Sequence, residues 1–173
     1  MAATPWKYVD DPEGLAEVAD ALARADRIAV DTESDSMHSY FEKVCLLQIA
    51  TEREAFVVDP LALEGRLEPL APAFADGGKR KVLHGSDYDI VCLKRDFAFE
   101  IRNIFDTMIA AQFLGLAKIG LADLVSDHFG ECLDKRHART NWARRNTWPA
   151  AGSSSSKAID RSVCLPWPAR RVW

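Results

Sequence analysis

At 173 residues, the chain is long enough for one domain with a buried core, and its 48% hydrophobic and 28% charged residues are ordinary for a globular protein. No apolar run reaches the length of a membrane span, and the N-terminus lacks the basic and apolar regions of a secretory signal, so we expect a cytoplasmic protein without a membrane partner. Residues 135–173 hold nine Lys or Arg and one acid, a net +8, which leaves −12 on residues 1–134. The acidic part can attract metal ions, while the basic part suits phosphates or is simply solvated.

The first half of the chain predicts one helix followed by three closely spaced strands. Apolar residues recur at helical spacing over 13–25. Short apolar runs bounded by turns predict strands at 27–31, 43–51 and 54–60. The short connections between these strands favour an antiparallel meander.

Helices and strands then alternate, which indicates an α/β fold. The expected elements are a helix at 67–74, a strand at 81–84, a helix at 87–94, a strand at 100–105, and helices at 107–115 and 121–129. The five strands should form one mixed sheet flanked by helices, with the later strands parallel.

The composition changes near Arg145, where a run rich in Ser, Pro and Trp begins without any helical or strand period. We therefore place one incomplete domain at 1–145 and an irregular or disordered tail at 146–173. The four cysteines match no zinc spacing and are read as reduced and structural. They are Cys45, Cys92, Cys132 and Cys164.

Two carboxylates follow the first buried strand. Asp31 and Glu33 are two residues apart, so in a strand their side chains point to the same side. Paired acids at this position repel each other unless a cation lies between them, and oxygen ligands of this kind suit Mg²⁺ or Mn²⁺. The pair alone equally fits one acid that caps a turn and another that is exposed.

A third acid, Asp89, falls within the helix that follows the 81–84 strand. Apolar residues of that strand and helix face the core, so Asp89 can project toward the edge where Asp31 and Glu33 lie. Asp87 is the competing acid, and its place at the helix start makes it a better candidate for a cap.

Taken together, the motifs D-T-E, S-Y, C-L-L-Q-I, H-G-S-D-Y-D-I and F-D-T-M-I-A-A resemble the ribonuclease D family of DEDD exonucleases and its exosome-associated eukaryotic relatives. The resemblance covers roughly residues 30–115 and, more weakly, the segment around Trp142. It implies a ribonuclease-H-like fold, a nucleic-acid partner and hydrolysis of nucleotides from a 3′ end, with RNA as the favoured substrate. It also implies two divalent ions, Mg²⁺ or Mn²⁺, bound by Asp31, Glu33 and Asp89, with Asp31 bridging both and Glu33 on the ion that carries the attacking water.

Several other residues could take part in the site or have a purely structural role. Tyr40 and Phe41 either stack on a terminal base or pack over the sheet. His84 either contacts the substrate or metal, or makes a structural hydrogen bond at a strand end. Asp106 is expected to cap a helix, and Gln48 to satisfy local hydrogen bonds. Basic residues that either contact phosphates or are solvated are Lys135, Arg136, Arg139, Arg144 and Arg145.

The family's third motif, a tyrosine followed four residues later by an aspartate, is absent after Trp142. The only acid beyond Asp134 is Asp160, and no tyrosine precedes it there. We hypothesise that the reading frame diverges near Arg145, and we expect weakened metal binding and an uncovered apolar surface. The leading prediction is a 3′-5′ exonuclease with reduced activity. The alternatives are a non-catalytic module that binds nucleic acid or protein, and a plain structural domain. The sequence does not decide whether the substrate is RNA or DNA, and it does not give the oligomeric state.

Overall fold

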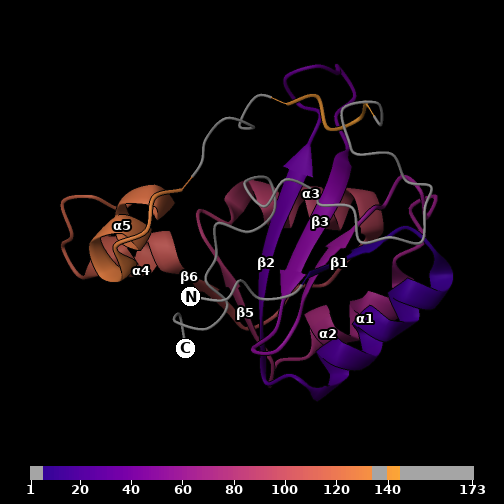
Figure 1. The fold of residues 1–173 in the computed structure, drawn as a ribbon, viewed down its shortest axis with the longest axis horizontal. Coiled ribbons are helices and arrows are strands. Elements are labelled where there is room, and N and C mark those ends of the chain that lie inside the picture. The colour runs from indigo at the N-terminus through magenta and orange to yellow at the C-terminus, as the bar shows by residue number, and fades with distance from the viewer. Residues whose placement is uncertain (1–5, 134–139, 145–173) are drawn as a thin grey trace.

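The structure is a computed structural model that describes residues 6–133 and 140–144 (Figure 1). The elements run, in chain order, β1 (Trp6–Val9), α1 (Pro12–Arg24), β2 (Arg27–Ser34), β3 (Val44–Ala50), β4 (Ala55–Val58), the 3₁₀ helix η1 (Glu68–Leu70), α2 (Ala71–Ala75), β5 (Arg80–Leu83), α3 (Asp87–Phe97), β6 (Ile104–Asp106), α4 (Thr107–Phe113) and α5 (Leu121–Phe129). In the described part of the chain, no helix has the length and apolar character needed to cross a membrane.

The strands form one mixed sheet in the order β1-β4-β3-β2-β5-β6. β2, β3 and β4 are antiparallel neighbours, and β5 and β6 are added in parallel beside β2. The predicted meander and the predicted parallel strands are therefore confirmed. The expected number of strands is wrong, because the sheet has six strands rather than five.

The additional strand is β1, which pairs in parallel with β4 at one edge of the sheet. The backbone N–H of Asp59 also donates to the carbonyl of Val9 at 2.8 Å, which fixes the end of this pairing. Four residues carry too little periodicity to indicate a strand. Its partner lies some fifty residues further along the chain, so local sequence gives no signal for it.

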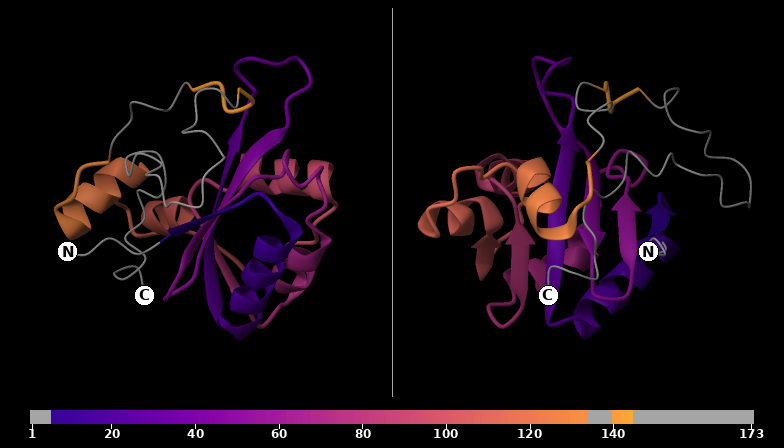
Figure 2. Two further views of the ribbon diagram at one scale, coloured as in Figure 1. Left: turned by 45° about the vertical axis from the view of Figure 1, so that its right-hand side comes forward. Right: turned by 60° about the vertical axis from the view of Figure 1, so that its left-hand side comes forward.

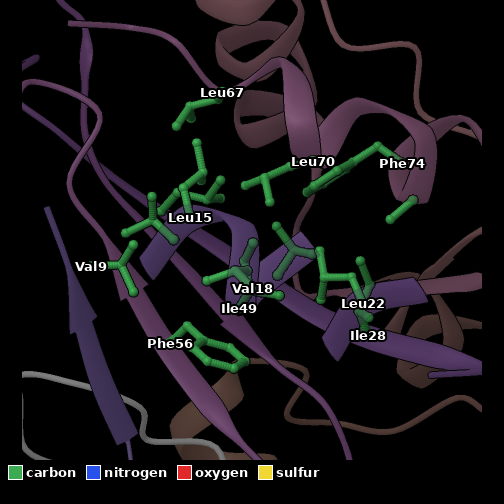
Figure 3. Close-up of a cluster of buried hydrophobic side chains, with 14 of the residues drawn as sticks. Val9, Leu15, Val18, Leu22, Ile28, Ile49, Phe56, Leu67, Leu70 and Phe74 are labelled. Carbon is green, nitrogen blue, oxygen red and sulfur yellow. The ribbon is translucent and has the colours of Figure 1, made fainter. Parts of the chain in front are cut away.

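One face of the sheet carries the main hydrophobic core, shown in Figure 3. α1 packs its apolar stripe there, and Leu15, Val18 and Leu22 are buried against strand residues such as Ile28 and Ile49. η1, α2 and α3 cover the same face, whereas α4 and α5 lie on the opposite side of the sheet from α1 (Figure 2). The second half of β2 lies beside α3, which Thr32 and Ser34 contact.

Several boundaries differ from the sequence-based expectations. β2 continues to Ser34 rather than ending at Asp31, so the paired acids lie within the strand. The expected helix at 67–74 is divided into η1 and α2. Cys45 and Cys92 are buried thiols, as expected for structural cysteines. Cys132 is exposed, so a structural role for Cys132 is wrong, and Cys164 lies outside the described residues.

Candidate functional site

Asp31 and Glu33 lie in the second half of β2, where the strand leaves the main core. Asp31 pairs with Gln48 of β3, and the Gln48 side-chain amide donates to Glu33 Oε1 at 3.3 Å. Gln48 is buried, so its contact with Glu33 is held in place by the sheet. The expectation that Gln48 serves local hydrogen bonds is confirmed, and one of those bonds orients a site carboxylate.

Asp89 lies in the first turn of α3 and is only 9% exposed. Its Oδ1 accepts a hydrogen bond from the backbone N–H of Thr32 at 3.1 Å and another from the Thr32 hydroxyl. Thr32 stands between Asp31 and Glu33, so this pair of bonds ties the third carboxylate to the strand segment that carries the other two. Thr32 points to the face of β2 opposite to Asp31 and Glu33, so Asp89 approaches from the α3 side of the strand, and its charge still acts on both of these acids.

The pKa values of the three acids are all raised, first by burial and then by neighbouring carboxylates. Burial, together with the charge of Asp89, raises the pKa of Asp31 to about 7. Burial and the charges of Asp31 and Asp89 raise the pKa of Glu33 to about 8. Burial also raises the pKa of Asp89. Although Asp31 is open to solvent on one side, the surrounding protein is dense enough to disfavour its ionised form.

These shifts indicate an acidic cluster that lacks a compensating cation within residues 6–133 and 140–144. None of the three carboxylates forms a salt bridge there. No three His, Cys, Asp or Glu side chains in that part of the chain already stand at metal-binding distances. The donors are all carboxylate oxygens, which fits a hard divalent cation, and their role as ligands stays a prediction.

The turn that leads into α3 is held by Asp106. Asp106 caps α4 by accepting from the backbone N–H groups of Met108 and Ile109, which confirms the predicted cap. Its two oxygens also accept from Gly85 at 3.1 Å and Ser86 at 2.7 Å. Burial opposes ionisation, but these N–H donors lower the pKa of Asp106 to about 2.

His84 and Asp87 flank this turn. His84 Nδ1 lies 2.9 Å from the hydroxyl of Thr107, so the structural hydrogen bond expected for His84 is present. Its contact with a substrate stays a prediction. Asp87 is not a cap, because the N-cap residue of α3 is Ser86, which makes no side-chain capping bond; Asp87 is exposed as the first residue of the helix.

Tyr40 and Phe41 form the tip of the loop between β2 and β3. They are 95% and 84% exposed, and their rings meet edge to face with centroids 5.1 Å apart. The alternative in which they pack over the sheet is therefore wrong. Base stacking stays a prediction that this exposure allows.

The basic residues are only partly described. Arg144 is exposed, next to Trp142, which is buried against Cys45 and Leu46. Lys135, Arg136, Arg139 and Arg145 lie outside the described residues, as does the region where the third motif would fall. Phosphate contacts from all five stay predictions.

Sequence reasoning did not identify Thr32, Glu42 or Arg95 as parts of this region. Thr32 sits inside the D-T-E motif, so its position between two acids was a usable signal. Glu42 and Arg95 gave none, because their contact joins residues 53 positions apart in the sequence.

Comparison with known proteins agrees with this geometry. The family model for the 3′-5′ exonuclease domain matches residues 6–153. Protein RRP6-like 1 of Arabidopsis thaliana is 35% identical over 143 residues, which are 82% of this chain and 22% of that protein. Ribonuclease D of Desulfotalea psychrophila is 33% identical over 79% of this chain and 37% of its own length.

Solved structures show the same fold. The catalytic core of RRP6 from Trypanosoma brucei superposes with a TM-score of 0.78 at 35% identity, covering 82% of this chain and 39% of that one. Escherichia coli RNase D gives a TM-score of 0.74 at 27% identity, covering 82% and 38%.

The sheet order, the D-T-E strand and the acid at the start of α3 define an exonuclease-type α/β domain. The chain belongs to the 3′-5′ exonuclease domain family, and the resemblance to ribonuclease D and its exosome-associated relatives is confirmed. It spans about a fifth of the length of the plant relative and under two-fifths of the bacterial one.

Proposed function

We propose that this chain is a domain that removes nucleotides from the 3′ end of RNA with the help of divalent metal ions. The observation that carries the proposal is the group formed by Asp31, Glu33 and Asp89: burial raises all three pKa values, and the charge of Asp89 further raises those of Asp31 and Glu33. A phosphodiester is itself anionic, so it can approach this cluster only when cations separate the two.

The ions we propose are Mg²⁺ or Mn²⁺, which supply an activated water and stabilise the leaving 3′ oxygen. The protein's part is to hold the ligand oxygens in place. Thr32 fixes one oxygen of Asp89, and Gln48 orients Glu33 from the neighbouring strand. Such supporting hydrogen bonds determine how tightly a carboxylate site binds metal.

RNA is the proposed substrate because E. coli RNase D, which shares this fold at 27% identity, is described as an exoribonuclease involved in structured RNA processing. The exposed rings of Tyr40 and Phe41 are proposed to stack on bases at the 3′ end. Arg144, with Arg139 and Arg145, is proposed to contact the phosphates, and His84 to line the approach to the site.

The missing third motif favours a second candidate, a non-catalytic module that binds RNA or a protein partner. The fourth acidic ligand of the family is absent after Trp142, so the site holds less negative charge for two divalent ions. Slow turnover would separate an impaired enzyme from a module without catalysis.

The test is release of labelled mononucleotide from a 3′-labelled single-stranded RNA in the presence of Mn²⁺. We expect slow release by the wild-type chain and none by Asp31→Ala. Asp87→Asn is the matched control, because it removes an exposed charge from the same helix start as Asp89 and should keep the wild-type rate. Turnover that is equal in wild type and Asp31→Ala would refute the assignment of catalysis to this site.

A further inference from the structure

The loop between β2 and β3 is held against α3 by side chains that the proposed chemistry does not use. The loop begins after Ser34, one residue beyond Glu33, and its exposed tip is formed by Tyr40 and Phe41. It returns to the sheet at Val44. Its base is closed by Asp35, which is buried and accepts from both the backbone N–H and the side-chain ammonium of Lys43 at 2.8 Å.

Glu42 connects the tip of this loop to α3. Its Oε2 accepts from the hydroxyl of Tyr88 at 2.5 Å, and its Oε1 accepts from the Arg95 guanidinium at 2.9 Å. The two partners lie seven residues apart on α3, so Glu42 is held at two points along one face of the helix. Both carboxylate oxygens are therefore used in fixing the loop.

Two further contacts extend this connection to both ends of the loop. The hydroxyl of Ser34 lies 3.2 Å from the hydroxyl of Tyr88, within hydrogen-bonding distance. Arg95 also pairs with Asp96 through two nitrogens at 2.6 and 3.0 Å, and Asp96 accepts from the backbone N–H of Val44 at 2.8 Å. Ser34 and Val44, at the two ends of the loop, and Glu42, next to the tip, are all connected to α3.

Tyr88 is the immediate neighbour of Asp89 on α3. One helix turn therefore presents a proposed metal ligand, Asp89, and the hydroxyl that anchors the aromatic loop. Consequently, the distance between the acidic cluster and the Tyr40–Phe41 tip is set by a single rigid element. A flexible loop of this length would otherwise sample many positions for the tip.

We propose that Tyr88 and Glu42 are positioning residues that hold the Tyr40–Phe41 tip in register with the acidic cluster, so that stacking of the terminal base places its phosphate over the carboxylates. The inference rests on the proposed function, because it requires an RNA 3′ end as ligand. Neither residue contacts the reacting atoms. Each acts through the loop, by preorganising the exposed stacking surface formed by Tyr40 and Phe41.

The test measures how much the terminal base contributes to RNA affinity, with and without the contacts that join the loop to α3 through Glu42 and Tyr88. The full chain is titrated, in Ca²⁺, into a short fluorescent oligoriboadenylate that ends in either adenosine or an abasic ribose. In the wild type, removal of the base should weaken binding roughly five-fold or more, since stacking on aromatic side chains is a substantial part of single-strand affinity. In Tyr88→Phe and Glu42→Ala the same removal should cost at most about two-fold, because the tip is no longer held in place.

Tyr8→Phe is the matched control. It also removes a tyrosine hydroxyl that donates to a carboxylate, but the bond joins Tyr8 of β1 to Asp59. It should keep the full penalty for base removal. An equal penalty in wild type, Tyr88→Phe and Glu42→Ala would overturn the inference while leaving the proposed function intact, as would a wild-type chain that binds both RNAs equally. Absence of any RNA binding by the wild type would instead overturn the proposed function itself.

Discussion

At the residue scale, Thr32 illustrates how a side chain between two acids can organise a third. Its hydroxyl and backbone N–H both donate to Asp89 Oδ1, so one oxygen of the proposed ligand is fixed. Thr32→Val keeps the shape of the side chain and the backbone donor but removes the hydroxyl.

We expect Thr32→Val to weaken Mn²⁺ binding roughly ten-fold, the lower end of the effect seen when a ligand loses its supporting hydrogen bond. Thr32→Ser should restore most of the affinity, because it restores the hydroxyl. Calorimetric titration of the three proteins is the measurement. Equal affinity in Thr32→Val and wild type would show that Asp89 needs no such support.

The raised pKa values of Asp31 and Glu33 predict an unusual pH dependence of stability. Their pKa values in the folded protein are about 7 and 8, against model values of 3.8 and 4.5. Between those values the folded state binds more protons than the unfolded state, so the free energy of unfolding falls as the pH rises from about 4 to about 8.

In the presence of a chelator, the melting temperature should therefore decrease across this range, and Asp31→Asn should flatten the decrease. Mn²⁺ added at about pH 8 should raise the melting temperature of the wild type by binding the ionised carboxylates. Asp20→Asn, an exposed change on α1, is the control and should behave as wild type. A decrease of the same size in Asp31→Asn would contradict the account.

Sequence alone identified the site residues that are charged but lie within or beside apolar segments. Asp31, Glu33 and Asp89 stand out because carboxylates rarely adjoin buried strands and helices without a purpose. Thr32 and Glu42 do not stand out, because threonine in a strand and glutamate in a loop are ordinary. Their roles depend on which residues of α3 lie opposite them, and that is decided by the tertiary packing.

At the element scale, Asp106 joins the β5–α3 turn to the start of α4. It accepts from two N–H groups of the turn, at Gly85 and Ser86, and from two of the helix, at Met108 and Ile109. Ser86 is buried, so without the Asp106 carboxylate its backbone N–H would have neither a protein acceptor nor water to bond.

Asp106→Ala should lower the free energy of unfolding by about 2 kcal/mol, combining a lost helix cap with an unsatisfied buried N–H. Urea denaturation followed by circular dichroism measures this. Asp127→Ala, an exposed change on α5, is the control and should alter stability by less than about 0.5 kcal/mol. A loss no larger in Asp106→Ala than in the control would refute the joining role.

Most elements could be predicted because their sequence signals are local. α5 ends at Gly130 in a left-handed conformation, and α1 is capped by Asp11, both of which follow from residue preference. β1 could not be predicted, since it exists only through pairing with β4. Lys81, fully buried in β5, would also be misjudged from composition; its ammonium donates to three backbone carbonyls at the end of α2 and nearby, among them Asp76 at 2.6 Å.

At the scale of the whole molecule, the segment from β6 to the turn after α4 exposes a group of large apolar side chains. Phe113 is 89% exposed and Leu114 is 76% exposed. The other members of the group are Ile104, Phe105, Ile109 and Leu116. An apolar surface of this kind promotes association when nothing covers it.

The purified chain should therefore self-associate with increasing concentration, and Phe113→Lys should reduce that association without lowering the melting temperature. Sedimentation velocity gives the measurement. Ala117→Lys adds the same charge at a nearby exposed position without removing a ring, so it separates the two causes. Equal reduction by both variants would mean that charge, rather than the apolar ring, controls association.

The account of the whole molecule depends on three carboxylates that accept divalent cations. The most direct measurement is a calorimetric titration of the 173-residue chain with Mn²⁺ at about pH 8, where the carboxylates ionise. We predict saturable binding in wild type and in Asp87→Asn, and loss of that binding in Asp31→Asn and Asp89→Asn. Absence of binding in the wild type, or binding that survives both site substitutions, would contradict the claim.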